Sequence, residues 1–267
     1  MNLLPIIVEP SLPLDLAGNS PSRSIYAIET TQRYQYGQRL ITVDGRCFKY
    51  SHSVGTLLSG YGAANIAPQN IGAVPPAAYT AGDLKVLVTI ASGDGYAGDG
   101  VVAADELAGG YFVSGHDETA AVQNRLIIGN TAVASGGGTT ILTLDGPIAN
   151  AQTTSGYNEV TLNPYRYLSK GVDFEYNAFM CVPAVNAAST YNFWGQTWGP
   201  CFVVPGGGDA TPGDSANDRS MYFVGDGSVN GGTALTVENG YQLAGFIIDA
   251  TASGTSAMPL LMLQISI

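Results

Sequence analysis

The sequence predicts an all-β protein: a β-sandwich or a β-barrel, a jelly-roll-like one included, with an extended N-terminal arm and long loops. Short runs of alternating apolar and polar residues recur along the 267 residues, separated by acidic-glycine or asparagine-glycine pairs. Glycine contributes 35 residues. Charged residues make up 12%, against about 25% in an average soluble domain. Almost no stretch has the 3.6-residue apolar period that indicates an amphipathic helix.

The clearest element is a hairpin over residues 39–50, RLITVDGRCFKY. Apolar and polar side chains alternate on both sides of Asp44-Gly45. An Asp-Gly pair between two alternating runs predicts a type I′ turn, in which both central residues have positive φ. The same pattern returns over 141–148, ILTLDGPI, and over 233–243, TALTVENGYQL. These repeats indicate short strands separated by tight turns.

Residues 1–37 are expected to form an extended arm. Pro5, Pro10, Pro13 and Pro21 exclude a helix interior, and each removes a backbone donor from a sheet. The segment is nevertheless apolar, which predicts that it lies in a groove of its own domain or of a neighbouring subunit. The candidate partner-binding residues are Leu3, Leu4, Ile6, Ile7, Leu12 and Leu14.

The β-rich body, residues 38–267, is expected to be one domain or two subdomains, 38–170 and 171–267. A segment rich in Gly, Ala and Pro covers 54–82, and a glycine-rich acidic loop covers 205–219. The predicted strands lie within 83–91, 101–114, 124–129, 139–144, 160–168, 174–185 and 191–200. The apolar segments 241–250 and 258–267 predict a closing hairpin buried on both faces.

A glycine-rich turn resembles a nucleotide-binding motif without its context. Gly93–Gly98, GDGYAG, matches G-x-G-x-x-G and follows a predicted strand. A dinucleotide site needs a helix to begin at the third glycine, but turn and strand residues follow here, and Asp99 would repel phosphate. Nearby acidic residues offer hard oxygen ligands for Ca²⁺, but acidic residues flanked by glycine are ordinary turn formers, the favoured interpretation. These acidic residues are Asp94, Asp99, Asp105 and Glu106.

Catalytic motifs are weak, so we expect no enzyme, no cofactor and no metal site. Gly213-Asp-Ser215 resembles the nucleophile block of one esterase family, which has its histidine near the C-terminus. The only histidines here, His52 and His116, lie upstream. No G-x-S-x-G sequence surrounds a serine, and the histidines lack metal-ligand spacing.

The charge limits the classes of partner, and the cysteine content indicates the redox environment. The net charge of −11, with seven Arg and three Lys scattered singly, argues against nucleic acid because no basic stripe could neutralise phosphates. Cys47, Cys181 and Cys201 are odd in number. We expect small buried thiols in a reducing cytosol, with a Cys181–Cys201 disulfide as the alternative. No secretory signal or membrane-spanning stretch is expected.

Three blocks of the chain resemble virion structural proteins of tailed bacteriophages. The first is 38–62, QRLITVDGRCFKYSHSVGTLLSGYG, with a D-G-R-x-F-x-Y strand and a glycine-flanked apolar segment. The second comprises AGGYFV and NRLIIGN within 100–130, followed by Asn163-Pro164-Tyr165. The third is 242–265, which is similar to the closing strands of capsid decoration proteins.

This resemblance implies a capsid decoration or cement protein. Such a protein is usually a homotrimer, binds the major capsid protein where capsid subunits meet, and has no catalytic residues. We therefore expect a location on the capsid surface of a virion assembled in a bacterial cytoplasm, with no nucleic-acid or membrane partner. A tail or head-fibre component is one alternative. Another is a carbohydrate-binding β module that uses Trp194, Trp198 and tyrosines as stacking platforms.

Overall fold

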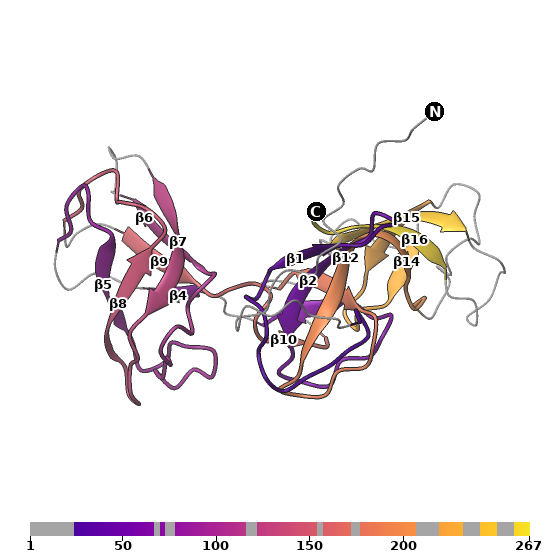
Figure 1. The fold of residues 1–267 in the computed structure, drawn as a ribbon, viewed down its shortest axis with the longest axis horizontal. Helices are drawn as coiled ribbons and strands as arrows, with labels where there is room; N and C mark the ends of the chain where they lie inside the picture. Colours follow the sequence, from indigo (N-terminus) through magenta and orange to yellow (C-terminus); the bar gives the residue numbers. More distant parts are fainter. Residues whose placement is uncertain are drawn as a thin grey trace. The chain divides into compact units, whose positions relative to one another are not determined.

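The fold is all-β, as the sequence predicts. The computed structural model describes residues 24–66, 70–72, 78–115, 122–153, 157–171, 177–206, 219–231, 241–249 and 259–267. Every regular element in these ranges is a β-strand, and the strands form two curled antiparallel sheets (Figure 1). The chain divides into two compact units. Unit 1 combines Met1–Ile66 with Tyr165–Ile267, and unit 2 is Ala67–Pro164.

Unit 1 contains a ten-stranded sheet whose main path runs β10-β3-β11-β12-β16-β15-β13-β14. The β1–β2 hairpin joins this sheet because β2 pairs with β12, the longest strand. The bounds are β1 Arg39–Ile41, β2 Cys47–His52, β3 Ala63–Asn65, β10 Leu168–Ser169, β11 Phe179–Pro183, β12 Asn192–Phe202, β13 Ser220–Phe223, β14 Val229–Gly231, β15 Leu243–Asp249 and β16 Leu260–Gln264. Buried residues of β11 to β16, such as Phe179, Phe223 and Leu261, form the main core.

Unit 2 contains a six-stranded sheet in the order β4-β9-β6-β7-β8-β5. The bounds are β4 Asn70–Gly72, β5 Lys85–Ile90, β6 Tyr111–Gly115, β7 Gln123–Asn130, β8 Gly138–Leu144 and β9 Tyr157–Thr161. In β5, Val86, Val88 and Ile90 are buried while Lys85 and Thr89 are exposed. The strand predicted over 83–91 therefore buries one face and presents the other to solvent.

The two units do not follow chain order, unlike the subdomains 38–170 and 171–267 considered from the sequence. Residues of the first part of the body pair with its last part: β2 with β12, and β3 with both β11 and β10. These long-range ladders place 38–66 in unit 1. Unit 2 is thus an insertion between β3 and β10.

The first hairpin forms where predicted, but the type I′ turn is wrong. Gly45 has a φ of +82°, whereas Asp44 does not have a positive φ. The Gly45 N–H donates to the Thr42 carbonyl at 2.9 Å, and the Thr42 N–H donates to the Arg46 carbonyl at 2.9 Å. This arrangement is a type I turn followed by a left-handed glycine. The longer loop needs only one positive φ, and glycine supplies it without steric cost.

The two other acidic-glycine segments do not reveal further hairpins. After β8 ends at Leu144, Asp145-Gly146 leads to Ile148, whose N–H donates to the Asp83 carbonyl at 2.8 Å. The Asp145 carboxylate instead accepts the Leu126 N–H at 3.1 Å. Most of the third segment, 232–240, lies outside the described residues.

The closing hairpin forms, but it is not buried on both faces. β15 and β16 lie side by side (Figure 1) and pair antiparallel. The register places Phe246 opposite Met262. On the inner face Ala244, Ile247, Leu261 and Leu263 are buried. On the outer face Leu243, Phe246 and Ile248 are 43–45% exposed. The composition of these strands is that of doubly buried strands, yet their outer face has no cover among the described residues.

Candidate interaction faces

Face 1 is the outer surface of β12, β16 and β15 in unit 1. Directly opposite residues of an antiparallel pair project on the same side of a sheet. The register therefore aligns Phe202 with Leu260, and Pro200 with Met262 and Phe246. Face 1 consists of Pro200, Phe202, Leu243, Phe246, Ile248, Leu260 and Met262. Phe202 is 59% exposed, and Asp249 at the end of β15 is a charged neighbour on this side.

Face 2 is the outer surface of the sheet in unit 2. Tyr111 pairs with Leu126, and Leu87 pairs with Ile141, so these four side chains share one side of the sheet. Face 2 consists of Leu87, Tyr111, Leu126, Ile128, Ile141 and Tyr157. Ile128 is 55% and Tyr157 61% exposed. Threonines and Glu159 lie between the apolar side chains, and the Tyr157 hydroxyl donates to the Glu159 carboxylate at 3.0 Å. Face 2 is therefore more polar than face 1.

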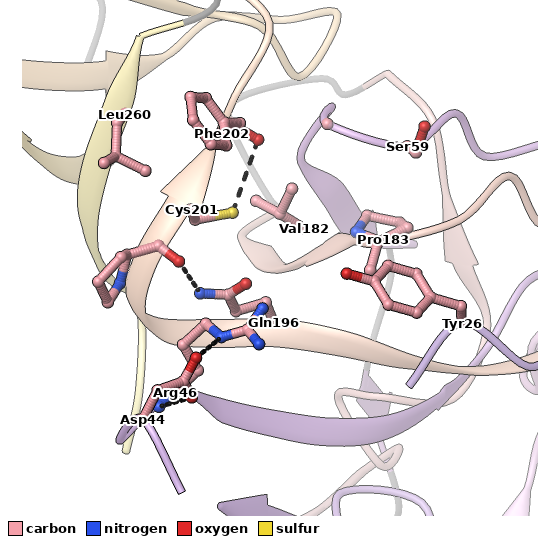
Figure 2. Close-up of a pocket in the computed structure, with 13 residues that line it drawn as sticks. Tyr26, Asp44, Arg46, Ser59, Val182, Pro183, Gln196, Cys201, Phe202 and Leu260 are labelled. Carbon is pink, nitrogen blue, oxygen red and sulfur yellow. Dashed lines mark hydrogen bonds and ion pairs between the residues drawn. The ribbon is translucent and has the colours of Figure 1, made fainter. Parts of the chain in front are cut away.

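A cavity of about 490 Å³ opens beside face 1. Figure 2 shows Phe202 and Leu260 on one side, and Val182, Pro183 and Tyr26 on the other. Beside the cavity, the pairing of β12 with β2 changes register between Gln196 and Trp198, and a bulge of this kind bends a strand. Phe202 and Leu260 thus belong to both the cavity wall and face 1.

Three polar side chains of this cavity, those of Asp44, Arg46 and Gln196, already have partners. Asp44 forms an ion pair with Arg46 at 2.7 Å and accepts a hydrogen bond from Thr42. Hydrogen bonding by Thr42, followed by the contacts with Arg46, lowers the pKa of Asp44. The Gln196 amide donates to the carbonyls of residues 198, 199 and 200 at 3.1, 3.3 and 2.8 Å. The first set of contacts lies within the turn of the β1–β2 hairpin and the second within β12, so both sets are local.

The cysteines are buried thiols, in agreement with the favoured prediction. Cys47, Cys181 and Cys201 are free, so the alternative Cys181–Cys201 disulfide is absent. Burial raises the pKa of Cys181 and of Cys201 to about 12. Cys201 borders the cavity, but at neutral pH it remains a protonated thiol and a poor nucleophile.

The acidic residues around the G-x-G-x-x-G motif stabilise turns. Gly93–Gly98 lies in consecutive turns, and no helix follows it. Backbone N–H groups donate to the carboxylates of Asp94, Asp99 and Glu106 at 2.7, 3.0 and 2.6 Å. Across the described ranges, no group of three or more His, Cys, Asp or Glu side chains could hold a metal ion. The turn-forming interpretation therefore accounts for these residues.

Of the aromatic residues proposed as sugar platforms, Trp194 is internal, whereas tyrosines such as Tyr26 and Tyr157 are exposed. Trp194 is 2% exposed and packs against Tyr34 and Tyr50 at centroid distances of 5.1 and 5.2 Å. Trp198 is half-buried. A buried indole cannot stack on a sugar. Of the two tryptophans, only Trp198 therefore remains as a candidate stacking platform. Among the described residues, the carbohydrate-binding alternative therefore rests on Trp198 and the exposed tyrosines.

Several predicted positions lie outside the described residues. They are the arm residues Leu3, Leu4, Ile6, Ile7, Leu12 and Leu14, together with His116 and Gly213–Ser215. The arm residues therefore stay a prediction. Faces 1 and 2 were not predicted from the sequence. The available signal was the closing segment, which is too apolar for a strand pair with one solvated face.

Comparison of the chain with protein-family models, with curated proteins and with solved structures yields no match. Among the described residues, no helix has the length and apolar character needed to cross a membrane.

Proposed function

We propose that this chain is a structural subunit of a tailed-phage virion: a decoration or cement protein that forms a homotrimer and binds the major capsid protein. The observation that carries the proposal is the exposed apolar face 2 of unit 2, where Ile128 and Tyr157 are 55% and 61% exposed. Exposed apolar patches usually mark interaction sites. The resemblance of 38–62 and 242–265 to virion proteins selects the capsid as the partner.

The chemistry of the described residues supports an interaction role. The Asp44 and Gln196 side chains of the cavity are bound by neighbouring groups of the chain itself. Backbone N–H groups of turns donate to the carboxylates of Asp94, Asp99 and Glu106. Apolar contact gains about 25 cal/mol per Å² of buried surface, and the symmetry of a shell repeats each contact many times. Many modest contacts then hold a subunit without a deep binding site. The capsid surface, in a particle assembled in the bacterial cytoplasm, is the location that this function requires.

Light scattering and co-sedimentation with purified shells test the proposal. We expect three times the 27.6 kDa chain mass in solution and recovery of the protein with shells. A monomer that stays in the supernatant would contradict both parts. A trimer that ignores shells would contradict the capsid partner and would favour another assembly, such as a fibre.

A matched pair of variants tests whether face 2 contributes to binding. Ile128→Asp places a carboxylate in the centre of face 2, which a covering partner would have to desolvate. Val101→Asp adds the same charge at a 38% exposed loop position of the same unit. We expect at least a tenfold loss of shell affinity for Ile128→Asp and little change for Val101→Asp. Equal affinities would remove face 2 from the interface.

A further inference from the structure

We propose that the apolar arm of this chain, residues 3–16, packs across face 1 of its own unit 1. The proposal does not depend on a capsid partner. It explains why β15 and β16 have the composition of doubly buried strands while Phe246 and Ile248 remain exposed among the described residues. A large apolar patch of this kind is uncommon on a soluble protein without a cover.

The arm has the composition that face 1 requires. Its apolar residues are Leu3, Leu4, Ile6, Ile7, Val8, Leu12, Leu14 and Leu16, and its charged side chains are Glu9 and Asp15. Pro5, Pro10 and Pro13 cannot donate backbone hydrogen bonds. β16 lies between β12 and β15, and β15 lies between β16 and β13, so neither strand has a free edge. The arm and face 1 are therefore suited to side-chain packing across the face rather than to the addition of a strand.

The arm is attached beside face 1. The described chain begins at Ser24, and Tyr26 lines the cavity that shares Phe202 and Leu260 with face 1. Figure 2 shows the Tyr26 ring beside Pro183, across the cavity from Phe202. The linker 17–23, AGNSPSR, is polar and separates this attachment from the apolar residues.

The length of the arm is sufficient for this contact. Fourteen extended residues span up to about 46 Å, and a seven-residue linker adds up to about 23 Å. The three strands of face 1 are about 5 Å apart, so crossing them requires only about 10–15 Å. A segment tethered at the edge of its binding surface has an effective concentration of about millimolar. The chain's own arm therefore has an advantage over the arm of a second copy.

Cysteine cross-linking tests the proposal on the full-length protein without shells. Ile7→Cys in the arm is combined with Phe246→Cys on face 1, and a short bismaleimide joins cysteines that lie close together. In the control, Ile7→Cys is combined with Ala188→Cys, an exposed position in the loop before β12. This loop precedes Asn192, whereas Phe202 of face 1 ends the eleven-residue strand. The native thiols are buried, and single-cysteine variants measure their background labelling.

We expect an intramolecular 7–246 cross-link, found by peptide mass analysis in a species with the mass of one chain, at least fivefold above the 7–188 control. An intermolecular 7–246 cross-link would overturn the proposal in favour of arm exchange between copies. Equal yields at 246 and 188 would overturn it because they show an arm without a preferred site.

Removal of the arm provides a second measurement. Deletion of residues 1–16 should increase the binding of a hydrophobic fluorescent dye several-fold, and Phe246→Ser with Ile248→Ser in the deleted chain should reverse the increase. Near-UV circular dichroism verifies that each variant retains its packed core. Unchanged dye binding after the deletion, in a folded protein, would contradict the proposed cover. Because no shell is present, neither measurement depends on the proposed capsid function.

Discussion

At the scale of single residues, burial decides the protonation of His52. Its ring lies near Tyr36 and Tyr167, at centroid distances of 5.8 and 5.9 Å. Nδ1 of His52 is buried and has no hydrogen-bond partner among the described residues. Burial, followed by the positive charge of Arg166, lowers the pKa of His52 to about 4. The imidazole is therefore neutral in the folded protein at neutral pH.

This shift predicts a loss of stability on mild acidification. Below its ordinary pKa of 6.5, His52 binds a proton in the unfolded chain but not in the folded one until about pH 4. The free energy of unfolding should therefore fall as the pH decreases through this window. We expect a fall of roughly 1–2 kcal/mol, less than the full pKa shift would give, because solvent screens a half-buried group. Urea unfolding at pH 7 and pH 5 measures the change.

His52→Phe should flatten this dependence between pH 7 and pH 5, while His116→Phe should retain it. Carboxylates titrate mainly below this interval, so the histidines dominate it. If the two variants behave alike, His52 is not the responsible group.

At the scale of elements, β12 is held against β11 by a glycine. A Cβ added at Gly195 would lie 2.2 Å from Cys181 Sγ and 2.6 Å from Cys181 Cβ. Pro183 pairs with Gly195, and β2 pairs with the opposite edge of β12 through Lys49. Neither neighbour can move without disturbing a ladder, so this close approach requires the absence of a side chain.

Gly195→Ala should accordingly lower the free energy of unfolding by about 1–3 kcal/mol, the usual cost of overpacking. Gly55→Ala serves as the control, because no atom lies within 4 Å of its added Cβ. We expect the control to change stability by less than about 0.5 kcal/mol. Chemical denaturation of both variants makes the comparison, and equal stabilities would show that β11 and β12 can separate freely at this point.

The elements also show how far sequence reasoning reaches. Alternation located β2 and β8, and short apolar runs located β5, β7 and the closing hairpin, because both patterns are local signatures of strands. Sequence reasoning failed at Asp44-Gly45, because Asp-Gly also suits a type I turn followed by a left-handed glycine, and only the strand register distinguishes the two. Sequence reasoning also could not find face 1. The sequence shows that Phe246 and Ile248 are apolar, but it does not show whether another segment covers them.

At the scale of the whole molecule, unit 2 is inserted at a point where the two flanking strands of unit 1, β3 and β10, pair with each other. Asn65 of β3 pairs with Leu168 of β10. Joining Ile66 directly to Tyr165 would leave four residues, Ile66 and 165–167, between the paired strands. Hairpin loops of this length are common. The two ends of the insertion are thus already positioned for a short connection.

Excision of 67–164 should therefore yield a folded unit 1, and residues 67–164 alone should form a folded unit 2. Both should unfold cooperatively in urea. Fragment 171–267, which follows chain order, should not fold, because it lacks β2 and β3 as partners for β12 and β11. A cooperative transition in that fragment, or its absence in the excised unit 1, would contradict the division.

The pairing of β3 with β10 has a further consequence for biosynthesis. A ribosome releases the first 66 residues long before most of their partners. The β1–β2 hairpin is local, but the ladder of β2 with β12 and both ladders of β3 require strands that begin at Leu168 and beyond. The contiguous unit 2 emerges in between with all its partners present, and domains generally fold as units during synthesis. The inserted unit should therefore fold first on the nascent chain. The enclosing unit can close only after the ribosome has translated most of the message.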